Sequence, residues 1–200
     1  MTVKAAVVGC GQWGRNHVRT LAGIGALAAI SDNDPDRAAA LSAEHGVPAL
    51  PLDDILQRHD IQAVVLALPP RLHAEIGQKI LAAGKDVLIE KPIALAPADA
   101  QASVALARDR GRVLMVGHIL RFHPVFEEMV RQVEAGRIGT LKHIVATRLG
   151  LGRFLGMDAV WDLAPHDLSL VIALAGTYDV DMQTLRQTVL SDETDVADLR

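Results

Sequence analysis

The regular alternation of short apolar runs with amphipathic stretches along residues 1–117 constrains the fold of this chain more than any other feature. Most of the runs are continuous stretches of small, aliphatic or β-branched residues, which is typical of strands that are buried on both faces. We therefore expect parallel βαβ units, with helices on both faces of a doubly wound sheet. The expected strands are Ala5–Val8, Leu27–Ile30, Ala63–Ala67, Val87–Ile89 and Val113–Val116, and the expected helices are Arg15–Ala22, Asp36–Glu44, Leu72–Ala83 and Ala98–Arg110.

The pattern changes after Gly117, where we expect the chain to enter a second domain. One pair of helices and two strands bury too little surface to make a good independent core. The sequence thus predicts an α/β domain over residues 1–120, followed by a partial α+β domain over residues 121–200. The elements expected in this second part are helices at Val125–Glu134 and Asp167–Ala175 and strands at Leu141–Leu149 and within Val180–Leu190.

Composition disfavours several classes of protein. The formal net charge of −4 gives no basic field for nucleic acid or anionic lipid, so neither is an expected partner. No apolar run approaches the roughly 18 residues that span a bilayer, and the N-terminal residues lead straight into a strand, so we expect a cytoplasmic protein. Cys10 is the only cysteine and the eight histidines show no metal-ligand spacing, so no disulfide and no metal site are expected.

The first apolar run is followed directly by the glycine-rich turn Gly9-Cys10-Gly11-Gln12-Trp13-Gly14. In a turn of this kind Gly9 permits the tight bend, Gly11 lets the backbone approach a pyrophosphate, and Gly14 allows close packing of helix on strand. The phosphates would lie at the N-terminus of the following helix, whose dipole favours an anion. The sequence therefore predicts a dinucleotide site with Gln12 and Trp13 beside it.

An acidic residue about 20 residues further on completes the Rossmann dinucleotide-binding pattern. Asp32 has this place, directly after the second predicted strand, where its carboxylate would accept hydrogen bonds from the adenosine ribose. A carboxylate there repels a 2′-phosphate, so NAD is expected rather than NADP. The alternative is an ordinary glycine turn followed by an aspartate that caps a helix.

A second candidate site lies at Glu90-Lys91-Pro92, where the fourth predicted strand ends. Ligands of open α/β sheets bind beyond the carboxyl ends of the strands. A lysine at that edge can hold a hydroxyl near a nicotinamide and stabilise a developing alkoxide. Leu68-Pro69-Pro70 ends the preceding strand in a similar way, and His73 follows within one helical turn. The alternative for Lys91 is a solvated lysine at a strand end.

Several segments occur in an order that is found in a known family. They are Val7-Val8-Gly9-Cys10-Gly11-Gln12-Trp13-Gly14, Ile30-Ser31-Asp32-Asn33-Asp34-Pro35, Leu68-Pro69-Pro70-Arg71-Leu72-His73, Glu90-Lys91-Pro92 and Gly117-His118-Ile119-Leu120-Arg121-Phe122. With these segments the whole chain resembles the glucose–fructose oxidoreductase, inositol dehydrogenase and rhizopine-catabolism (Gfo/Idh/MocA) family. The resemblance implies an NAD- or NADP-dependent oxidoreductase of sugars, cyclitols or related alcohols. The residues that we expect at the cofactor are Gly9, Gly11, Gln12, Trp13, Gly14, Asp32, Leu68, Pro69, His73, Glu90 and Lys91.

Asp162 and His166 stand four residues apart, as in the second-domain signature of that family. The resemblance implies that His166 is the acid/base and that Asp162 contacts the sugar, with Lys91 polarising the substrate oxygen. Residues i and i+4 share one face of a helix, although Pro165 leaves open whether Asp162 is helical. The alternative is a capping aspartate and a surface histidine.

Four further residues are weaker candidates for substrate contact. Arg148 and Arg153 bracket a glycine-rich loop and could pair with phosphate or carboxylate. This region looks most like family members that act on UDP-N-acetylglucosamine or UDP-N-acetylglucosaminuronate, but solvated loop arginines are an equal alternative. His118 and Arg121 could line the cleft or make hydrogen bonds between domains.

Family members usually continue well beyond the length of this chain. On this basis we expect a truncated protein that keeps its cofactor site and lacks part of the substrate-side wall. The family forms homo-oligomers, and the interface would be incomplete here. The resemblance leaves open an inositol or aldose dehydrogenase, and a dinucleotide-binding fragment without catalysis.

Overall fold

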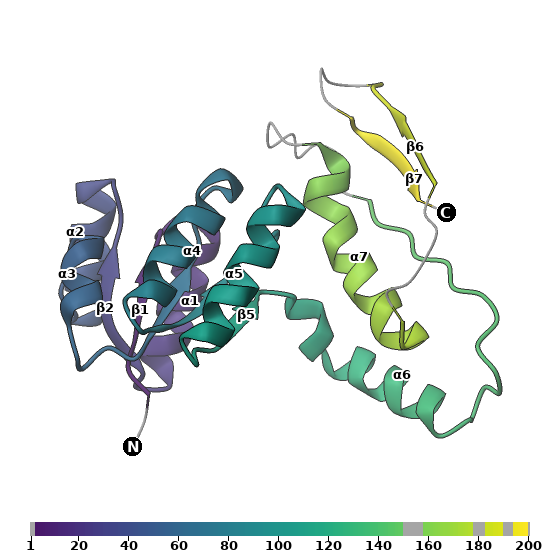
Figure 1. The fold of residues 1–200 in the computed structure, drawn as a ribbon, viewed down its shortest axis with the longest axis horizontal. Helices are drawn as coiled ribbons and strands as arrows, with labels where there is room; N and C mark the ends of the chain where they lie inside the picture. The colour runs from purple at the N-terminus through teal and green to yellow at the C-terminus, as the bar shows by residue number, and fades with distance from the viewer. Residues whose placement is uncertain (1–2, 150–157, 178–182, 190–193, 200) are drawn as a thin grey trace. The chain divides into compact units, whose positions relative to one another are not determined.

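A computed structural model describes residues 3–149, 158–177, 183–189 and 194–199 of the chain (Figure 1). The chain divides into two compact units, Met1–Gly117 and His118–Arg200. The boundary thus lies close to the end of the fifth predicted strand, and each unit is described by itself below.

The first unit is built on a five-stranded parallel sheet with the strand order β2-β1-β3-β4-β5. The strands are β1 (Ala5–Val8), β2 (Leu27–Ser31), β3 (Ala63–Leu66), β4 (Asp86–Ile89) and β5 (Leu114–Val116). All neighbouring strands pair in parallel. The strand order reverses between β1 and β3, which is the switch point where open α/β sheets bind their ligands. The predicted doubly wound Rossmann fold is confirmed.

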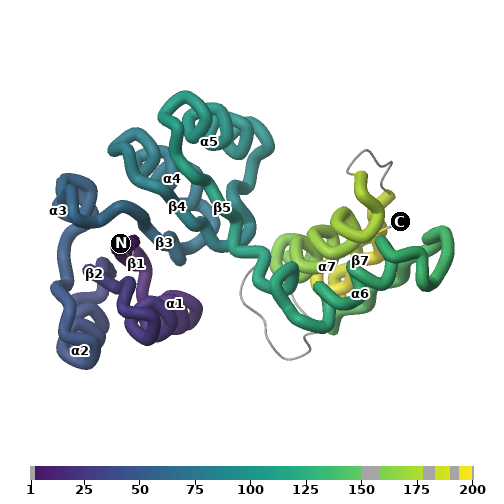
Figure 2. Tube along the Cα trace, turned by 90° about the horizontal axis from the view of Figure 1, so that it is seen from below, coloured from purple at the N-terminus to yellow at the C-terminus, as the bar shows by residue number. Residues whose placement is uncertain are grey.

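Helices cover both faces of this sheet because alternate residues of each strand point to opposite faces. Val7 and Val65 pack with Val18 of α1 and Leu41 of α2, whereas Ala6 and Val64 belong to a second core. Figure 2 shows α1 and α2 on one side of the strands and α4 and α5 on the other. The helices are α1 (Gln12–Gly23), α2 (Pro35–His45), α3 (Leu52–Gln57), α4 (His73–Ala82), α5 (Pro97–Asp109) and the 3-10 helix η1 (Pro70–Leu72).

The second unit joins helices to a small antiparallel sheet. Its elements are the 3-10 helix η2 (Ile119–Phe122), α6 (Pro124–Glu134), α7 (Ala159–Ala175), β6 (Thr184–Gln187) and β7 (Val196–Leu199). β6 pairs with β7, and their side chains are largely exposed. This arrangement is of the predicted α+β type.

Three details of the second unit differ from the sequence prediction. The segment Leu141–Leu149 is not a strand. Within the described residues it pairs with no strand, and Val145 and Leu149 are 76% and 88% exposed, so these two side chains are not buried as those of a sheet strand would be. α7 begins at Ala159 rather than Asp167, because the Asp158 carboxylate caps it by accepting from the Val160 N–H at 2.7 Å. The C-terminal segment contains β7, a strand that the sequence analysis did not predict.

None of the described helices has both the length and the apolar character that crossing a membrane requires.

Candidate functional site

The glycine-rich turn connects β1 to α1 at the switch point of the sheet. Gly9 has a φ of +88°, and a Cβ there would lie 2.5 Å from the carbonyl oxygen of Ala67. A Cβ at Gly14 would overlap the carbonyl oxygen of Gly9, so neither position has room for a side chain. A Cβ at Gly11 would meet no atom within 4 Å. The backbone beside Gly11 is therefore open at the start of α1, and it fits the approach of a pyrophosphate.

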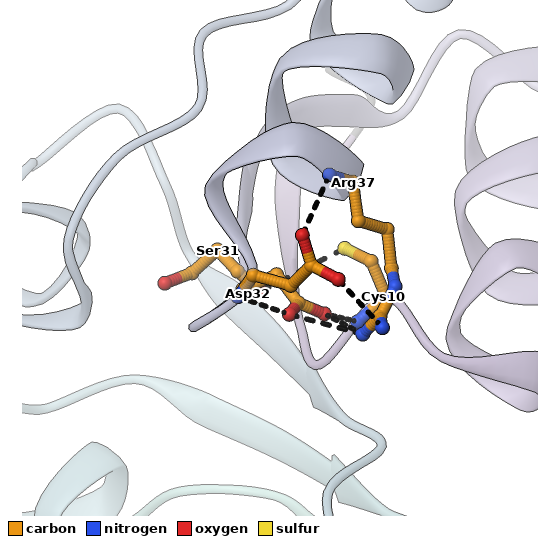
Figure 3. A network of polar contacts seen from close by, with 5 residues as sticks. Cys10, Ser31, Asp32 and Arg37 are labelled. Atoms are coloured by element: carbon orange, nitrogen blue, oxygen red, sulfur yellow. Dashed lines mark hydrogen bonds and ion pairs between the residues drawn. The ribbon is translucent and has the colours of Figure 1, made fainter.

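Asp32 follows β2, and its carboxylate accepts hydrogen bonds from three other residues (Figure 3). The N–H of Cys10 donates to Oδ2 at 2.6 Å, and the N–H of Asp34 donates to Oδ1 at 2.8 Å. The Arg37 guanidinium lies 3.1 Å from Oδ1 and 3.3 Å from Oδ2. The Asp32 side chain is only 3% exposed. Burial would raise the pKa of Asp32, but these backbone and guanidinium donors outweigh it and lower the pKa.

Arg37 is a residue that sequence analysis missed. It also pairs with Asp34, the N-cap of α2, through an NH2–Oδ2 contact of 2.9 Å. A pocket of about 580 Å³ lies beside this arginine and the glycine-rich turn. The lining residues are Gly11, Gln12, Arg15, Asn16, Arg19, Arg37, Leu41, Glu44 and His45. The short spacing between Asp32 and Arg37 was the available signal, because it places the arginine in the first turn of the helix that follows β2.

Cys10 lies inside the glycine-rich turn and is completely buried. Burial, reinforced by the charge of Asp32, raises the pKa of its thiol to about 11. The thiol is thus protonated at neutral pH, and a thiolate nucleophile is not available at this position. Cys10 is therefore a small buried side chain of the turn rather than a nucleophile.

The carboxyl end of β4 carries Glu90 and Lys91. The Oε1 atom of Glu90 lies 2.7 Å from Nε2 of His17 on α1, and Oε2 accepts from the Lys91 N–H at 3.3 Å. Burial would raise the pKa of Glu90, but the hydrogen bond and charge of His17, with smaller contributions from Lys91, lower it. Glu90 is therefore an ion at neutral pH that holds the backbone at Lys91. Lys91 itself is partly exposed at the ligand-binding edge.

His73, an expected cofactor residue, is buried and bonded to two backbone carbonyls. Its Nε2 lies 2.7 Å from the carbonyl oxygen of Leu68, and its Nδ1 lies 2.7 Å from that of Pro92. The side chain is only 1% exposed. His73 therefore ties together the chain segments that follow β3 and β4. Leu68 is half-buried and Pro69 exposed beside it.

In the second unit, Asp162 and His166 both lie within α7. The N–H of Asp162 donates to the carbonyl oxygen of Asp158 at 3.1 Å, so the helix is formed here despite Pro165. Residues at i and i+4 share one face of a helix, and both side chains are partly buried. The same helix therefore carries a carboxylate and an imidazole on one face, and an imidazole is a group that can exchange a proton with a hydroxyl.

The weaker substrate candidates differ in the contacts that they make in the structure. The Arg148 guanidinium makes a bidentate pair with Asp167, with distances of 2.9 and 2.8 Å, and this hydrogen bonding raises its pKa. Arg121 donates to the carbonyl oxygen of Ser169 at 3.4 Å, and His118 is half-buried. Arg153 lies outside the described residues.

The described residues contain no group of acidic, histidine or cysteine side chains that could hold a metal.

Comparison with known proteins identifies relatives of this chain. Residues 3–118 match the GFO_IDH_MocA profile, described as an oxidoreductase family with an NAD-binding Rossmann fold. A UDP-N-acetylglucosamine 3-dehydrogenase of Acidithiobacillus ferrooxidans is 32% identical over 98% of this chain and 61% of its own length. An inositol 2-dehydrogenase of Saccharopolyspora erythraea is 40% identical over 70% of this chain and 43% of its own length.

Solved structures of known proteins are also similar to this chain. The A. ferrooxidans 3-dehydrogenase superimposes with a TM-score of 0.85 at 32% identity, over 100% of this chain and 63% of that chain. A 3-ketoreductase from Actinomadura kijaniata in complex with NADP and TDP-benzene gives a TM-score of 0.62 at 30% identity, over 68% of this chain and 43% of that chain. The chain thus spans less than two thirds of the length of these relatives.

Proposed function

The chain belongs to the GFO_IDH_MocA oxidoreductase family, and from this premise we propose that it is a dehydrogenase that transfers a hydride from a secondary sugar hydroxyl to NAD. The observation that carries the proposal is the position of Lys91 at the same sheet edge as the glycine-rich turn. The turn leaves room for a pyrophosphate, and Lys91 follows the carboxyl end of a strand, which is where open α/β sheets bind their ligands.

In this proposal each functional residue has one task. The backbone around Gly11 holds the pyrophosphate. Asp32 would accept from the adenosine ribose, which requires the Arg37 guanidinium to move away from the carboxylate. The Lys91 ammonium donates a hydrogen bond to the substrate hydroxyl oxygen, and His166 takes the hydroxyl proton as the carbon–hydrogen bond breaks. A bound nicotinamide would supply the hydride acceptor for that carbon. Asp162 orients the sugar or His166 from the same face of α7.

We propose a sugar or nucleotide-linked sugar as the substrate, and a UDP-N-acetylhexosamine as the first to test. The similarity to the A. ferrooxidans 3-dehydrogenase supports this choice because it extends over 98% of the chain. The second candidate is an inositol, supported by a relative with 40% identity over 147 residues. Arg148 is engaged by Asp167 in the structure, so a phosphate contact from Arg148 would require that pair to open.

NAD is the proposed cofactor because a carboxylate directly after β2, such as that of Asp32, would repel a 2′-phosphate. Arg37 moderates this preference, since it offsets the charge of Asp32 and adjoins a pocket with two further arginines. Guanidinium groups bind phosphate well, and the A. kijaniata relative is described in complex with NADP. We therefore expect NADP to bind more weakly than NAD but measurably.

The test combines a binding measurement with a turnover measurement on the 200-residue chain. NAD at a hundredfold excess over its Kd should raise the free energy of unfolding by about 2.7 kcal/mol, and NADP at the same concentration by less. Formation of NADH is then followed with UDP-N-acetylglucosamine and myo-inositol as substrates. NAD binding without turnover on any sugar or cyclitol would leave a dinucleotide-binding protein, and no response to either dinucleotide would contradict the proposal entirely.

A further inference from the structure

The segment Glu90-Lys91-Pro92 is held by a histidine on each side of the lysine. On one side, Nε2 of His17 lies 2.7 Å from Oε1 of Glu90. On the other side, Nδ1 of His73 lies 2.7 Å from the carbonyl oxygen of Pro92. The two histidines come from different helices, so the three-residue segment is fixed to α1 and to α4 at the same time.

The contact with His17 connects Lys91 to the glycine-rich turn. His17 lies in the second turn of α1, the helix that starts at this turn. The Glu90 carboxylate, which is 17% exposed, is shared between the imidazole and the N–H of Lys91. A Cβ at Gly117 would lie 3.0 Å from the carboxyl group of Glu90. The carboxyl group therefore fits beside residue 117 because that residue is a glycine. The position of the carboxylate is therefore confined by α1, by the Lys91 backbone and by the end of β5.

The contact with His73 connects Lys91 to the other side of the switch point. The two ring nitrogens of His73 face the carbonyl oxygens of Pro92 and Leu68, both at 2.7 Å. The ring is 1% exposed, and water does not compete for these acceptors. The segments after β3 and β4 are thus joined through one buried side chain.

We propose that His17 and His73 are positioning residues for Lys91, which fix its backbone relative to the glycine-rich turn and to the switch-point loop after β3. The inference rests on the proposed function, in which Lys91 contacts the reacting hydroxyl. Misplacement of a reacting group by about 1 Å can cost about a hundredfold in rate. Neither histidine contacts the substrate in this account, and each acts only through the segment that it holds.

The experiment compares the His17→Gln, His73→Gln and Glu90→Gln variants with the native chain. The expected result is a fall in kcat of about tenfold to a hundredfold in each variant, with little change in the KM for NAD. His59→Gln, which changes an exposed histidine of the same unit, is the matched control and should leave kcat and KM unchanged. The His17→Gln/Glu90→Gln double variant should be no slower than the slower single variant, because both substitutions break one contact.

A second readout does not depend on turnover. Trace labelling with acetic anhydride, followed by peptide mass spectrometry, gives the reactivity of Lys91 relative to the exposed Lys79 in the same sample. We expect the relative reactivity of Lys91 and its dependence on pH to change in the three variants and not in His59→Gln. If His73→Gln shows no cooperative unfolding transition, that variant is not folded, and the comparison is made with His17→Gln and Glu90→Gln alone.

The two readouts separate the possible outcomes. Changed Lys91 labelling without turnover in the native chain would support the positioning role and contradict the proposed activity. Unchanged labelling in folded variants would overturn the inference, whatever the activity. A fall in kcat that is matched by an equal loss of NAD affinity would also overturn it, because that result places the histidines in cofactor binding.

Discussion

Asp32 is the residue whose ionisation the fold controls most clearly. Its carboxylate accepts from two backbone N–H groups and from Arg37 while it is almost completely buried. Hydrogen bonds to a charged group contribute about 1.5–3 kcal/mol each to stability. The same contacts order the turn at Cys10 and the start of α2, so one side chain connects the first two βα crossings.

We predict that Asp32→Asn lowers the free energy of unfolding by about 1–3 kcal/mol at pH 7. The folded pKa of Asp32 is lowered, so its contribution is fully present above the ordinary unfolded value of about 3.9 and is lost as the pH falls through the folded value. Urea unfolding over a pH series should therefore show the native chain and the variant converging below about pH 4. Asp109→Asn, at an exposed carboxylate, should change stability by less than about 0.5 kcal/mol. A difference that is constant with pH would refute the assignment.

A substitution of Lys91 tests the role of its ammonium group in the proposed reaction. Lys91→Met keeps much of the apolar stem and removes the ammonium, so kcat/KM should fall by about 10²–10⁴ while the stabilisation by NAD is retained. Lys79→Met removes an exposed lysine that pairs with Asp53 and should leave kcat/KM unchanged. Initial rates and thermal unfolding with NAD measure the two effects. Full activity in Lys91→Met would exclude this lysine from the reaction.

At the scale of elements, the connection between β1 and α1 depends on two positions without a Cβ. The carbonyl oxygen of Gly9 occupies the place that a Gly14 side chain would need, so α1 can begin next to β1 only with glycine there. Gly23, at the other end of the same helix, has open space around it. A substitution at Gly14 therefore tests the steric requirement of the turn, whereas the same substitution at Gly23 tests only the helix propensity of the new residue.

Gly14→Ala should weaken NAD binding and lower the melting temperature, because the new methyl group forces the backbone of the turn to move. Gly23→Ala should be neutral or stabilise the protein by up to about 1 kcal/mol, since alanine restricts the unfolded chain and favours the helix. Thermal unfolding of both variants with and without NAD makes the comparison. Equal NAD affinity in Gly14→Ala and the native chain would contradict the role given to the turn.

Sequence patterns predicted the first unit well because its strands are buried on both faces. The run Ala5–Val8 was predicted with the bounds that the structure has. α3 was not predicted, since six residues with one buried side chain, Ile55, carry little periodicity. The strand expected at Leu141–Leu149 was wrong and β7 was missed, because pairing with a distant partner decides both.

The candidate site was predictable only where a local motif exists. The glycine-rich turn, Asp32 and Lys91 follow directly from short segments next to apolar runs. The pairing of Arg37 with Asp32 could have been predicted, because only five positions separate the two residues. The contact between His17 and Glu90 could not, because it joins residues 73 positions apart and depends on the packing of α1 against the sheet.

For the whole molecule, the parallel sheet brings one functional segment to its carboxyl edge after each strand. Gly9, Asp32, Leu68, Glu90 and Gly117 follow β1, β2, β3, β4 and β5, respectively. Among these strands β1 and β3 are the most deeply buried, whereas β6 and β7 in the second unit are mostly exposed. The two units should therefore differ in local stability.

Amide hydrogen exchange should show this difference directly. We expect the slowest exchange in β1 and β3 and much faster exchange in β6 and β7, because exposed backbone hydrogen bonds open easily. Addition of NAD should slow exchange in the turn from Gly9 to Gly14 and leave β6 and β7 unchanged. Equal protection of both sheets would show that the hairpin is as stable as the Rossmann core.

The burial of Cys10 has a practical consequence for spectroscopy. The chain contains one cysteine, and that thiol is fully enclosed and protonated at neutral pH. A maleimide dye would therefore react selectively with a cysteine introduced on the surface, without removal of the native one. In the unmodified chain, slow reaction with a thiol-specific chromogenic reagent would report how often the first βα crossing opens, so the protein carries its own probe of that motion.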